Sequence, residues 1–350
     1  WQTTRSINLG VDMGFLNNRL NVHVDVYRKR TVDLLQNITI PPSTGFPSFL
    51  ENSGSVQNKG LEFVLEGDII KTNDFTWSTN FNISFNRNTI LSLSDTSVTK
   101  QFAGNISTGY APFIQAVGHP IGAIYGYVED GYYDNEAEVR ADPYYATQPD
   151  NIISRTVGEI KYKNLDGIPG VTAGDRTFIG DVNPKYTFGI TNDFSYKNWQ
   201  LSVFVNSSQG NDIINLTTFF LARNVGDENI LQSMYDGAWA AGKGQANANA
   251  TWPKIEKQNW RNYFFSRRFV EDGSYVRIKN ITLSYAVPTK VMGISGLRLS
   301  LAVNNAYTFT KYSGYDPEMN GFGENPALYG VDLGGYPVAR TYNFTINCIF

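Results

Sequence analysis

The sequence predicts an all-β fold, an antiparallel transmembrane β-barrel with long loops at one end, and three observations lead to it. Apolar and polar residues alternate with period two over many segments of the 350-residue chain. The connections between these segments are alternately short and long. The apolar positions of the segments carry almost no charge, as expected of strands that face lipid on one side and water on the other.

The predicted strands alternate over lengths that suit a half-buried strand better than a helix. In the first of them Ile7, Leu9 and Val11 share one face, whereas Asn8 and Asp12 share the other. In chain order the predicted strands are 7–13, 20–27, 61–66, 75–85, 186–194, 199–205, 275–285, 297–303 and 342–350. The segment 275–285 changes face around Lys279 and Asn280, which predicts a β-bulge there.

The lengths of the connections favour a barrel in a membrane. Short connections are expected near 14–18, 70–74, 196–198 and 287–296, and long ones near 29–60, 86–185, 207–274 and 304–337. Outer-membrane barrels have tight periplasmic turns and long extracellular loops, so every second connection is long. A soluble sandwich gives no reason for its loops to be sorted in this way.

Aromatic residues near strand ends suit the interfacial girdles of such a barrel. These residues are Phe75, Trp77, Tyr186, Trp199, Tyr275, Tyr342 and Phe350.

The length of the last strand suits a membrane crossing. The first charged residue on its outward face is Arg340, about ten residues from the end of the chain. A strand needs ~9 to 11 residues to cross a bilayer. Arg340 is therefore expected at the outer rim.

A soluble antiparallel sandwich also alternates, so it is the competing fold. Its function would be carbohydrate binding or adhesion, with the aromatics serving as stacking platforms. The two folds differ in where Leu61, Phe63, Leu65, Phe81, Ile83, Phe344 and Ile346 lie. Burial of these side chains between two sheets would contradict a barrel.

Composition excludes several other classes of protein. The 29 Lys and Arg against 32 Asp and Glu give a formal net charge of -3, which offers no footprint for nucleic acid. The single cysteine, Cys348, excludes an intrachain disulfide, and His23 and His119 leave little for histidine-based catalysis. No apolar run approaches the ~20 residues of a membrane-spanning helix. We therefore expect no enzyme activity and no catalytic residue.

The strand count predicts an incomplete barrel. About nine strands are evident, whereas single-chain bacterial barrels have an even number with both ends on the periplasmic side. If the last strand ends in the periplasm, the first must run inward from outside. We therefore expect residues 1–350 to be the C-terminal part of a larger barrel, with its plug and N-terminal strands absent from this sequence.

Several long motifs resemble one known family. They include INLGVDMGFLNNRL, IPPSTGFPSFLENSGSVQNKGLEF, VGHPIGAIYGYVEDGYY, DRTFIGDVNPKYTFGITNDFSYKNWQLSVFV, DGSYVRIKNITLSYAVP, KYSGYDPE and GGYPVARTYNFTINCIF. In this order they resemble the SusC/RagA family of TonB-dependent outer-membrane transporters, and the likeness covers nearly the whole chain. The terminal Phe350 is similar to the last residue expected of a barrel that the outer-membrane assembly machinery reads.

The resemblance implies a 22-stranded barrel with a plugged lumen in the bacterial outer membrane. It also implies a SusD-like surface lipoprotein as a lid, energy from the TonB complex, and import of oligosaccharides or peptides. This chain would contribute wall and extracellular loops, and contacts with lid and substrate are expected in the loops near 99–160 and 211–272. No substrate-binding residue can be assigned there.

One loop is a candidate calcium site, because family members often carry an EF-hand-like run before the Asp-Arg-Thr motif. The residues at the expected positions are Asn164, Asp166 and Asp175. Ile168 stands where a ligand oxygen is expected, and Asn164 replaces a carboxylate, so a simple turn loop is the favoured alternative. No other cofactor is expected.

Two further motifs are given structural interpretations. Gly237, Gly242 and Lys243 resemble a phosphate-binding loop, but Gly244 replaces the Ser or Thr that would bind magnesium. The glycosylation-type sequons at Asn82, Asn280 and Asn343 fall within predicted strands. We interpret the first as a flexible loop and the second as a result of abundant Asn, Ser and Thr.

Overall fold

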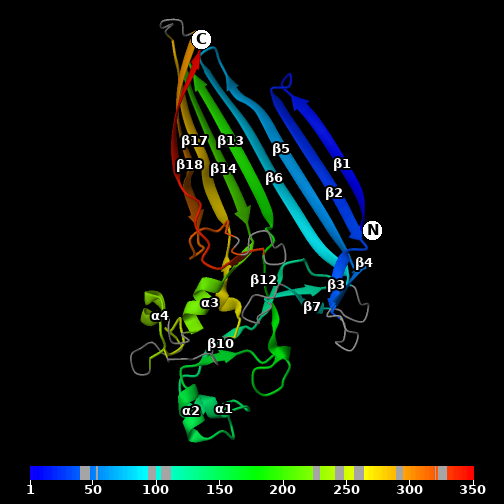
Figure 1. Ribbon diagram of the computed structural model, residues 1–350, viewed down its shortest axis with the longest axis vertical. Coiled ribbons are helices and arrows are strands. Elements are labelled where there is room, and N and C mark those ends of the chain that lie inside the picture. The colour runs from blue at the N-terminus through cyan, green and yellow to red at the C-terminus, as the bar shows by residue number, and fades with distance from the viewer. Residues whose placement is uncertain are drawn as a thin grey trace.

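The protein is a tall antiparallel sheet with a folded unit of loops at one end (Figure 1). The computed structural model describes residues 1–39, 48–52, 54–93, 100–103, 112–223, 229–240, 248–255, 264–288, 295–319, 321 and 329–350. The sheet has nine strands in the order β1-β2-β5-β6-β13-β14-β17-β18-β20, and each pairs with its neighbours in antiparallel register. We call this sheet the wall. Its edges stay apart, so it is an open part of a barrel.

Each of the nine predicted strands lies in the wall, and most are longer than predicted because their polar outer ends also pair. Their bounds are β1 Thr3–Phe15, β2 Leu20–Val32, β5 Ser55–Lys71, β6 Phe75–Ser92, β13 Tyr186–Tyr196, β14 Trp199–Gln209, β17 Tyr275–Val287, β18 Gly296–Thr310 and β20 Thr341–Ile349. The sequons at Asn82, Asn280 and Asn343 lie in these strands, as predicted.

The connections are sorted by length as predicted. The hairpin between β1 and β2 turns through Leu16, Asn17 and Asn18, which have φ of 57°, 56° and 59°. Asparagine tolerates this left-handed region better than most residues, and the tight turn requires it. The short turns between β1 and β2, β5 and β6, and β13 and β14 lie at one end of the wall with the C-terminus, and the N-terminus lies toward the end with the long loops (Figure 1).

The predicted bulge lies at Lys279 and turns the side chains at the long-loop end of β17 to the inner face. Against β14, Phe204 pairs with Asn280 and Val205 with Ile278, so Lys279 is the extra residue of β17. Against β18, Ile278 pairs with Tyr307 and Asn280 with Asn304, so on that side the extra residue belongs to β18. The shift places Tyr275 and Arg277 on the polar face. Tyr275 is 9% exposed and its hydroxyl donates to Glu318 at 2.7 Å. Placing Tyr275 in an aromatic girdle was therefore wrong, because the bulge reverses the face of the strand beyond it.

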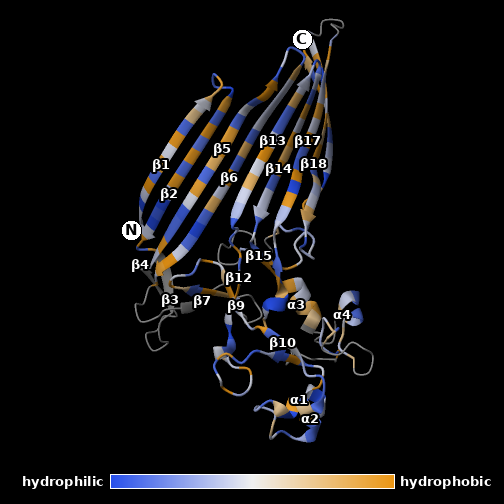
Figure 2. Ribbon diagram, turned by 180° about the vertical axis from the view of Figure 1, so that it is seen from behind, coloured by the Kyte–Doolittle hydropathy of each residue, from blue (hydrophilic) through white to orange (hydrophobic). Residues whose placement is uncertain are grey.

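The apolar face of the wall is not covered by a second sheet. Figure 2 shows hydrophobic and hydrophilic residues alternating along each strand. Leu61, Phe344 and Ile346 are 40%, 67% and 57% exposed, and Phe63, Leu65, Phe81 and Ile83 are partly exposed. None of them belongs to a core among the described residues. The competing sandwich fold is therefore wrong.

The main hydrophobic core lies in the loops, which the sequence analysis did not predict. Buried residues such as Phe219, Phe269 and Ile214 pack together there, far from the apolar face of the wall. Small sheets support this core: β12-β9-β8-β7, β16-β15-β19, β10-β11 and the separate pair β3-β4. We call this folded part the loop unit.

The elements of the loop unit are short. The strands are β3 Leu35–Thr39, β4 Ser48–Asn52, β7 Lys100–Ala103, β8 Phe113–Ala116, β9 Ala123–Gly126, β10 Glu129–Tyr132, β11 Ile160–Tyr162, β12 Thr177–Asp181, β15 Asp212–Asn215, β16 Val270–Asp272 and β19 Val331–Asp332. The helices are α1 Glu136–Ala141, α2 Asp150–Thr156, α3 Leu216–Arg223 and α4 Gln232–Asp236, with one-turn helices at Ala173–Asp175 and Arg267–Phe269. No helix in the described ranges has the length and apolar character to cross a membrane.

Opposite faces of one strand give a direct test of the wall's orientation. Phe344 lies mid-strand on the apolar face of β20, and the adjacent Asn343 lies on the polar face. We expect Phe344→Arg in the complete protein to lower the free energy of unfolding in bilayers by about 2 to 4 kcal/mol, because it places a charge against lipid. The matched change Asn343→Arg should cost far less. Equal losses from the two changes would contradict this orientation.

Candidate functional site

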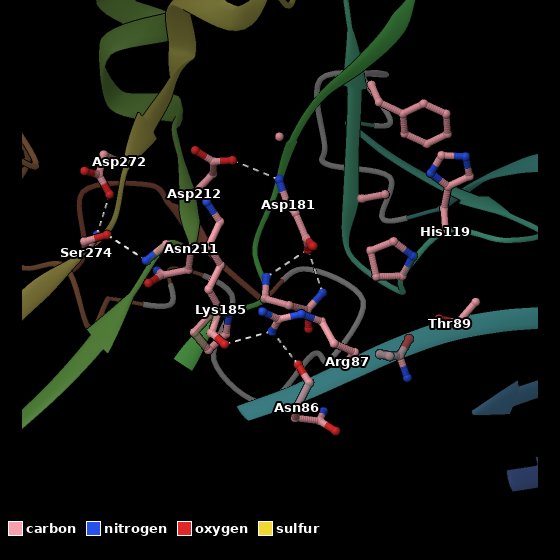
Figure 3. A pocket seen from close by; sticks show the side chains of 18 of the residues that line it. Asn86, Arg87, Thr89, His119, Asp181, Lys185, Asn211, Asp212, Asp272 and Ser274 are labelled. Atoms are coloured by element: carbon pink, nitrogen blue, oxygen red, sulfur yellow. Dashed lines mark hydrogen bonds between the residues drawn. The ribbon is translucent and has the colours of Figure 1, made fainter. Parts of the chain in front are cut away.

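A polar cavity of about 960 Å³ lies where the wall meets the loop unit (Figure 3). Its lining comes from the outer end of β6, the start of β13, the turn after β14 and the small strands β12 and β16. These segments meet because the long loops of neighbouring strands all leave the wall at the same end of the strands. We call this cavity the rim pocket.

The carboxylates of the rim pocket hold two small sheets together. Asp212 accepts from the backbone N–H of Asp181 at 2.9 Å, which joins β15 to β12. Asp181 in turn accepts from the backbone and side-chain amides of Asn183, at 2.9 and 2.7 Å. Burial raises the pKa of Asp181, and the neighbouring Asp212 charge raises it further. This pair therefore fixes the backbone on one side of the pocket.

Two arginines of the rim pocket, Arg87 and Arg267, already donate hydrogen bonds within the protein. Arg87 donates to the backbone carbonyls of Asn86 and Lys185, at 2.9 and 2.8 Å, and so ties β6 to the start of β13. Arg267 lies 3.5 Å from Asp212 and donates to the carbonyl of Val270 at 2.7 Å. The pocket therefore contains both carboxylates and guanidinium groups, and the hydrogen bonds of these groups hold the backbone around them in place.

The far side of the rim pocket is a polar turn. Asp272 accepts from the backbone N–H of Ser274 at 3.0 Å, and hydrogen bonding from Ser274 lowers the pKa of Asp272. Gly210 has φ of 77° and its N–H donates to the Ser274 hydroxyl at 2.8 Å. On the opposite side His119 stacks on Phe178, with ring centroids 3.7 Å apart.

The chemistry of the rim pocket suits binding of a polar solute. Its charged and amide groups can hydrogen-bond to hydroxyl, amide or zwitterionic groups, and its aromatic pair offers a flat apolar surface. Among the described residues no carboxylate forms an ion pair with His119, and its ring is instead stacked on Phe178.

A second polar cluster is buried on the inner face of the wall. Arg277 has a side chain 2% exposed and pairs with Asp316 at 2.6 Å and with Glu318 at 2.5 Å. Lys279 also donates to Glu318, at 2.9 Å. Burial alone would raise the pKa of Glu318, but hydrogen bonds from Lys279 and Tyr275, with the charge of Arg277, hold this pKa below its usual value.

This cluster, which we call the ion clamp, joins two sequence motifs. Arg277 and Lys279 belong to DGSYVRIKN, and Asp316 and Glu318 belong to KYSGYDPE. The clamp fastens the loop after β18 across the inner face, where Asp316 also accepts from the backbone N–H of Glu318 at 2.9 Å. The sequence contains both motifs but does not predict their pairing, because nothing in a single sequence relates residues about 40 positions apart.

The structure brings the candidate calcium ligands into one loop. Asp175 is 1% exposed and accepts from the backbone N–H groups of Leu165 and Thr172, each at 2.7 Å. Asp166 accepts from the N–H of Ile168 at 2.8 Å, and Asn164 accepts from that of Gly167 at 2.6 Å. Burial alone would raise the pKa of Asp175, but the backbone hydrogen bonds lower it.

Calcium binding at Asn164, Asp166 and Asp175 stays a prediction, as does the simple turn. Three or more His, Cys, Asp or Glu suitably placed for a metal ion were not found among the described residues. His23 lies on the polar face as predicted, with Nδ1 2.7 Å from Asp12 and Nε2 3.7 Å from Glu66. The glycines and lysine at 242–244 of the phosphate-loop resemblance lie outside the described residues.

The arrangement of wall and loops agrees with a comparison against known families. The profile described as "TonB dependent receptor-like, beta-barrel" matches residues 1–306. The chain belongs to this family. The members are receptors and transporters of the outer membrane, and membership confirms the prediction that the chain is not an enzyme.

Individual relatives confirm the resemblance to SusC and RagA. TonB-dependent receptor P3 of Formosa agariphila is 34% identical over 100% of the chain and 34% of the relative. SusC of Bacteroides thetaiotaomicron is 26% identical over 98% of the chain and 31% of the relative. The RagAB peptide transporter structure matches with a TM-score of 0.79 and 25% identity, over 99% of the chain and 35% of the matched one. The chain thus spans about a third of its relatives' length.

The ion clamp makes a prediction about stability. Replacing Arg277 with Met leaves Asp316 and Glu318 without their main cation, so we expect the complete protein to lose about 3 to 5 kcal/mol of unfolding free energy. Limited proteolysis within 311–319 should become faster. The matched change Arg298→Met removes an exposed arginine from the next strand and should cost little. The idea fails if both variants behave like the parent.

The loop at Asp175 makes a prediction that also separates its two interpretations. We expect Asp175→Ala to speed proteolytic cleavage between 164 and 175, because three backbone N–H groups lose their acceptor. The pKa of Asp175 is lower in the folded loop than in the unfolded chain. The carboxylate therefore stabilises the loop fully above the unfolded pKa of 3.8, and this stabilisation is lost as the pH falls through the lower folded pKa. Under the turn interpretation calcium leaves the parent's cleavage rate unchanged; protection by calcium supports a calcium site.

Proposed function

We propose that the protein containing this chain imports oligosaccharides or peptides across the bacterial outer membrane. The observation that carries the proposal is that short and long connections alternate along the nine-stranded wall, and that the described parts of the long ones lie at the same end. The similarity to SusC and to the RagAB peptide transporter supports it over nearly the whole chain. In this proposal the apolar face of the wall meets lipid, the polar face lines the lumen, and the loop unit is extracellular.

The loop unit suits a structure that must hold a partner and a solute outside the membrane. It has its own hydrophobic core, so its surfaces are positioned by packing rather than left to independent loops. The ion clamp fixes the inner side of this unit to the wall. The rim pocket adds a polar cavity at the junction, with charges of both signs.

The same family relationship supports a proposal about the partners. We infer that a SusD-like surface lipoprotein covers the loop unit, and that the TonB complex supplies energy through a part of the protein outside residues 1–350. Transport then depends on conformational gating rather than covalent chemistry. The chemistry of the rim pocket accommodates both solute classes, because sugars and peptides present hydroxyl, amide and charged groups.

An uptake assay tests the proposal. Cells that express the complete protein should deplete either an oligosaccharide mixture or a peptide mixture from the medium, as measured by mass spectrometry. Cells that lack the gene, and cells that lack TonB, should not. Purification under mild detergent should recover a surface lipoprotein at a one-to-one ratio. Depletion that persists without TonB would contradict energy-coupled import, and recovery of the protein in the soluble fraction would contradict the location.

A further inference from the structure

Five basic residues gather on the apolar face of the wall, just beyond its lipid-facing band. Arg28, Lys59 and Arg87 are direct cross-strand neighbours on β2, β5 and β6, and we call them the basic row. Arg5 and Arg30 are paired with each other one layer further toward the long loops. All five side chains belong to exposed residues.

The position of the basic row coincides with the boundary of the apolar band. On β6 the apolar face runs over eleven residues, from Phe75 to Phe85, and Arg87 is the next residue on that face. A rise of about 3.3 Å per residue and a tilt of about 40° give the band a height of about 25 Å. This matches the lipid-facing band of outer-membrane barrels, so Arg87 begins the polar region of the membrane.

The basic row is not balanced by carboxylates of its own face. The face of β1, β2, β5 and β6 that carries the row has no Asp or Glu, whereas the opposite face carries Asp12, Asp25, Glu62 and Glu66. Within the described residues no carboxylate lies within 4.0 Å of any of the five bases. Like charges directly opposite each other on paired strands destabilise a sheet. An external anion would relieve this repulsion.

An apolar groove of about 590 Å³ runs up to the basic row. The part of the groove nearer the short turns is lined by Leu9, Val26, Leu61 and Phe85. The part nearer the long loops is lined by the three bases of the row. An apolar channel that ends at clustered cations matches a lipid, whose acyl chain is apolar and whose phosphate is anionic. A free anion would not fill the apolar groove. An acidic protein would not reach it, because the groove lies on the part of the wall that faces lipid.

We propose that the basic row and this groove bind a phosphorylated lipid of the outer leaflet, with phosphate on Arg28, Lys59 and Arg87 and an acyl chain in the groove. The inference rests on the proposed orientation of the wall in the outer membrane. Such a lipid would stabilise β1 and β2 by neutralising the like charges that they carry. The lipid would occupy the outside of the barrel, and Arg87, which lines both the groove and the rim pocket, would lie between the lipid and the solute.

The test compares lipid binding by matched variants of the complete transporter. Native mass spectrometry in detergent would measure bound lipid A, added in its bisphosphorylated and its dephosphorylated forms. The test variant is Arg28→Gln with Lys59→Gln; Arg87 is kept because it also ties β6 to β13. The control is Lys29→Gln with Arg298→Gln, which removes the same charge from exposed bases on the polar face.

We expect the parent and the control to retain bisphosphorylated lipid A, and the test variant to bind it ~30-fold more weakly, at about fivefold for each base removed near a lipid surface. Dephosphorylated lipid A should bind equally weakly to all three. Equal binding of the two lipid forms, or equal losses in test and control variants, would overturn the proposal. Membrane fractionation separates the two hypotheses: protein absent from the outer membrane contradicts the proposed function, whereas inserted protein with no phosphate preference contradicts this inference alone.

Discussion

The pleat of the nine hydrogen-bonded strands is the constraint on which the other features depend. Successive side chains point to opposite faces, so each strand that pairs with its neighbours presents one apolar and one polar surface. In lipid every backbone polar group needs a partner within the protein, and the register of the wall provides such partners between neighbouring strands. A slip of one residue would exchange the two faces, so the pattern of side chains fixes the register.

The bulge at Lys279 shows how one extra residue in β17 changes which side chains face inward. Without it, Arg277 and Tyr275 would share the apolar face with Ile281 and Leu283. With it they turn inward, where Arg277 meets Asp316 and Glu318 in the ion clamp. A local departure from period two therefore creates the buried anchor that connects the loop after β18 to the wall.

The loop unit and the wall are stabilised by different interactions. The wall keeps its apolar residues outside and relies on hydrogen-bonded strands and polar ladders on its inner face, such as Asn280 with Asn304 at 2.7 Å. The loop unit buries Phe219, Phe269 and Ile214 in a core like that of a soluble domain. The rim pocket lies at the junction of the two, where charged groups satisfy strand ends and remain accessible to a polar solute.

The sequence alone determined the wall. Alternation located all nine strands, the change of face located the bulge, and loop lengths gave the direction of each strand, because these features depend on neighbouring residues in one segment. The sequence also located Asn164, Asp166 and Asp175 in one loop, but it could not pair Arg277 with Asp316, place Tyr275 inward or reveal the core of the loop unit. Those features depend on contacts between segments far apart in the chain, which have no local period. The cross-strand alignment of Arg28, Lys59 and Arg87 likewise exists only in the sheet, since pairing register brings together residues that the sequence separates.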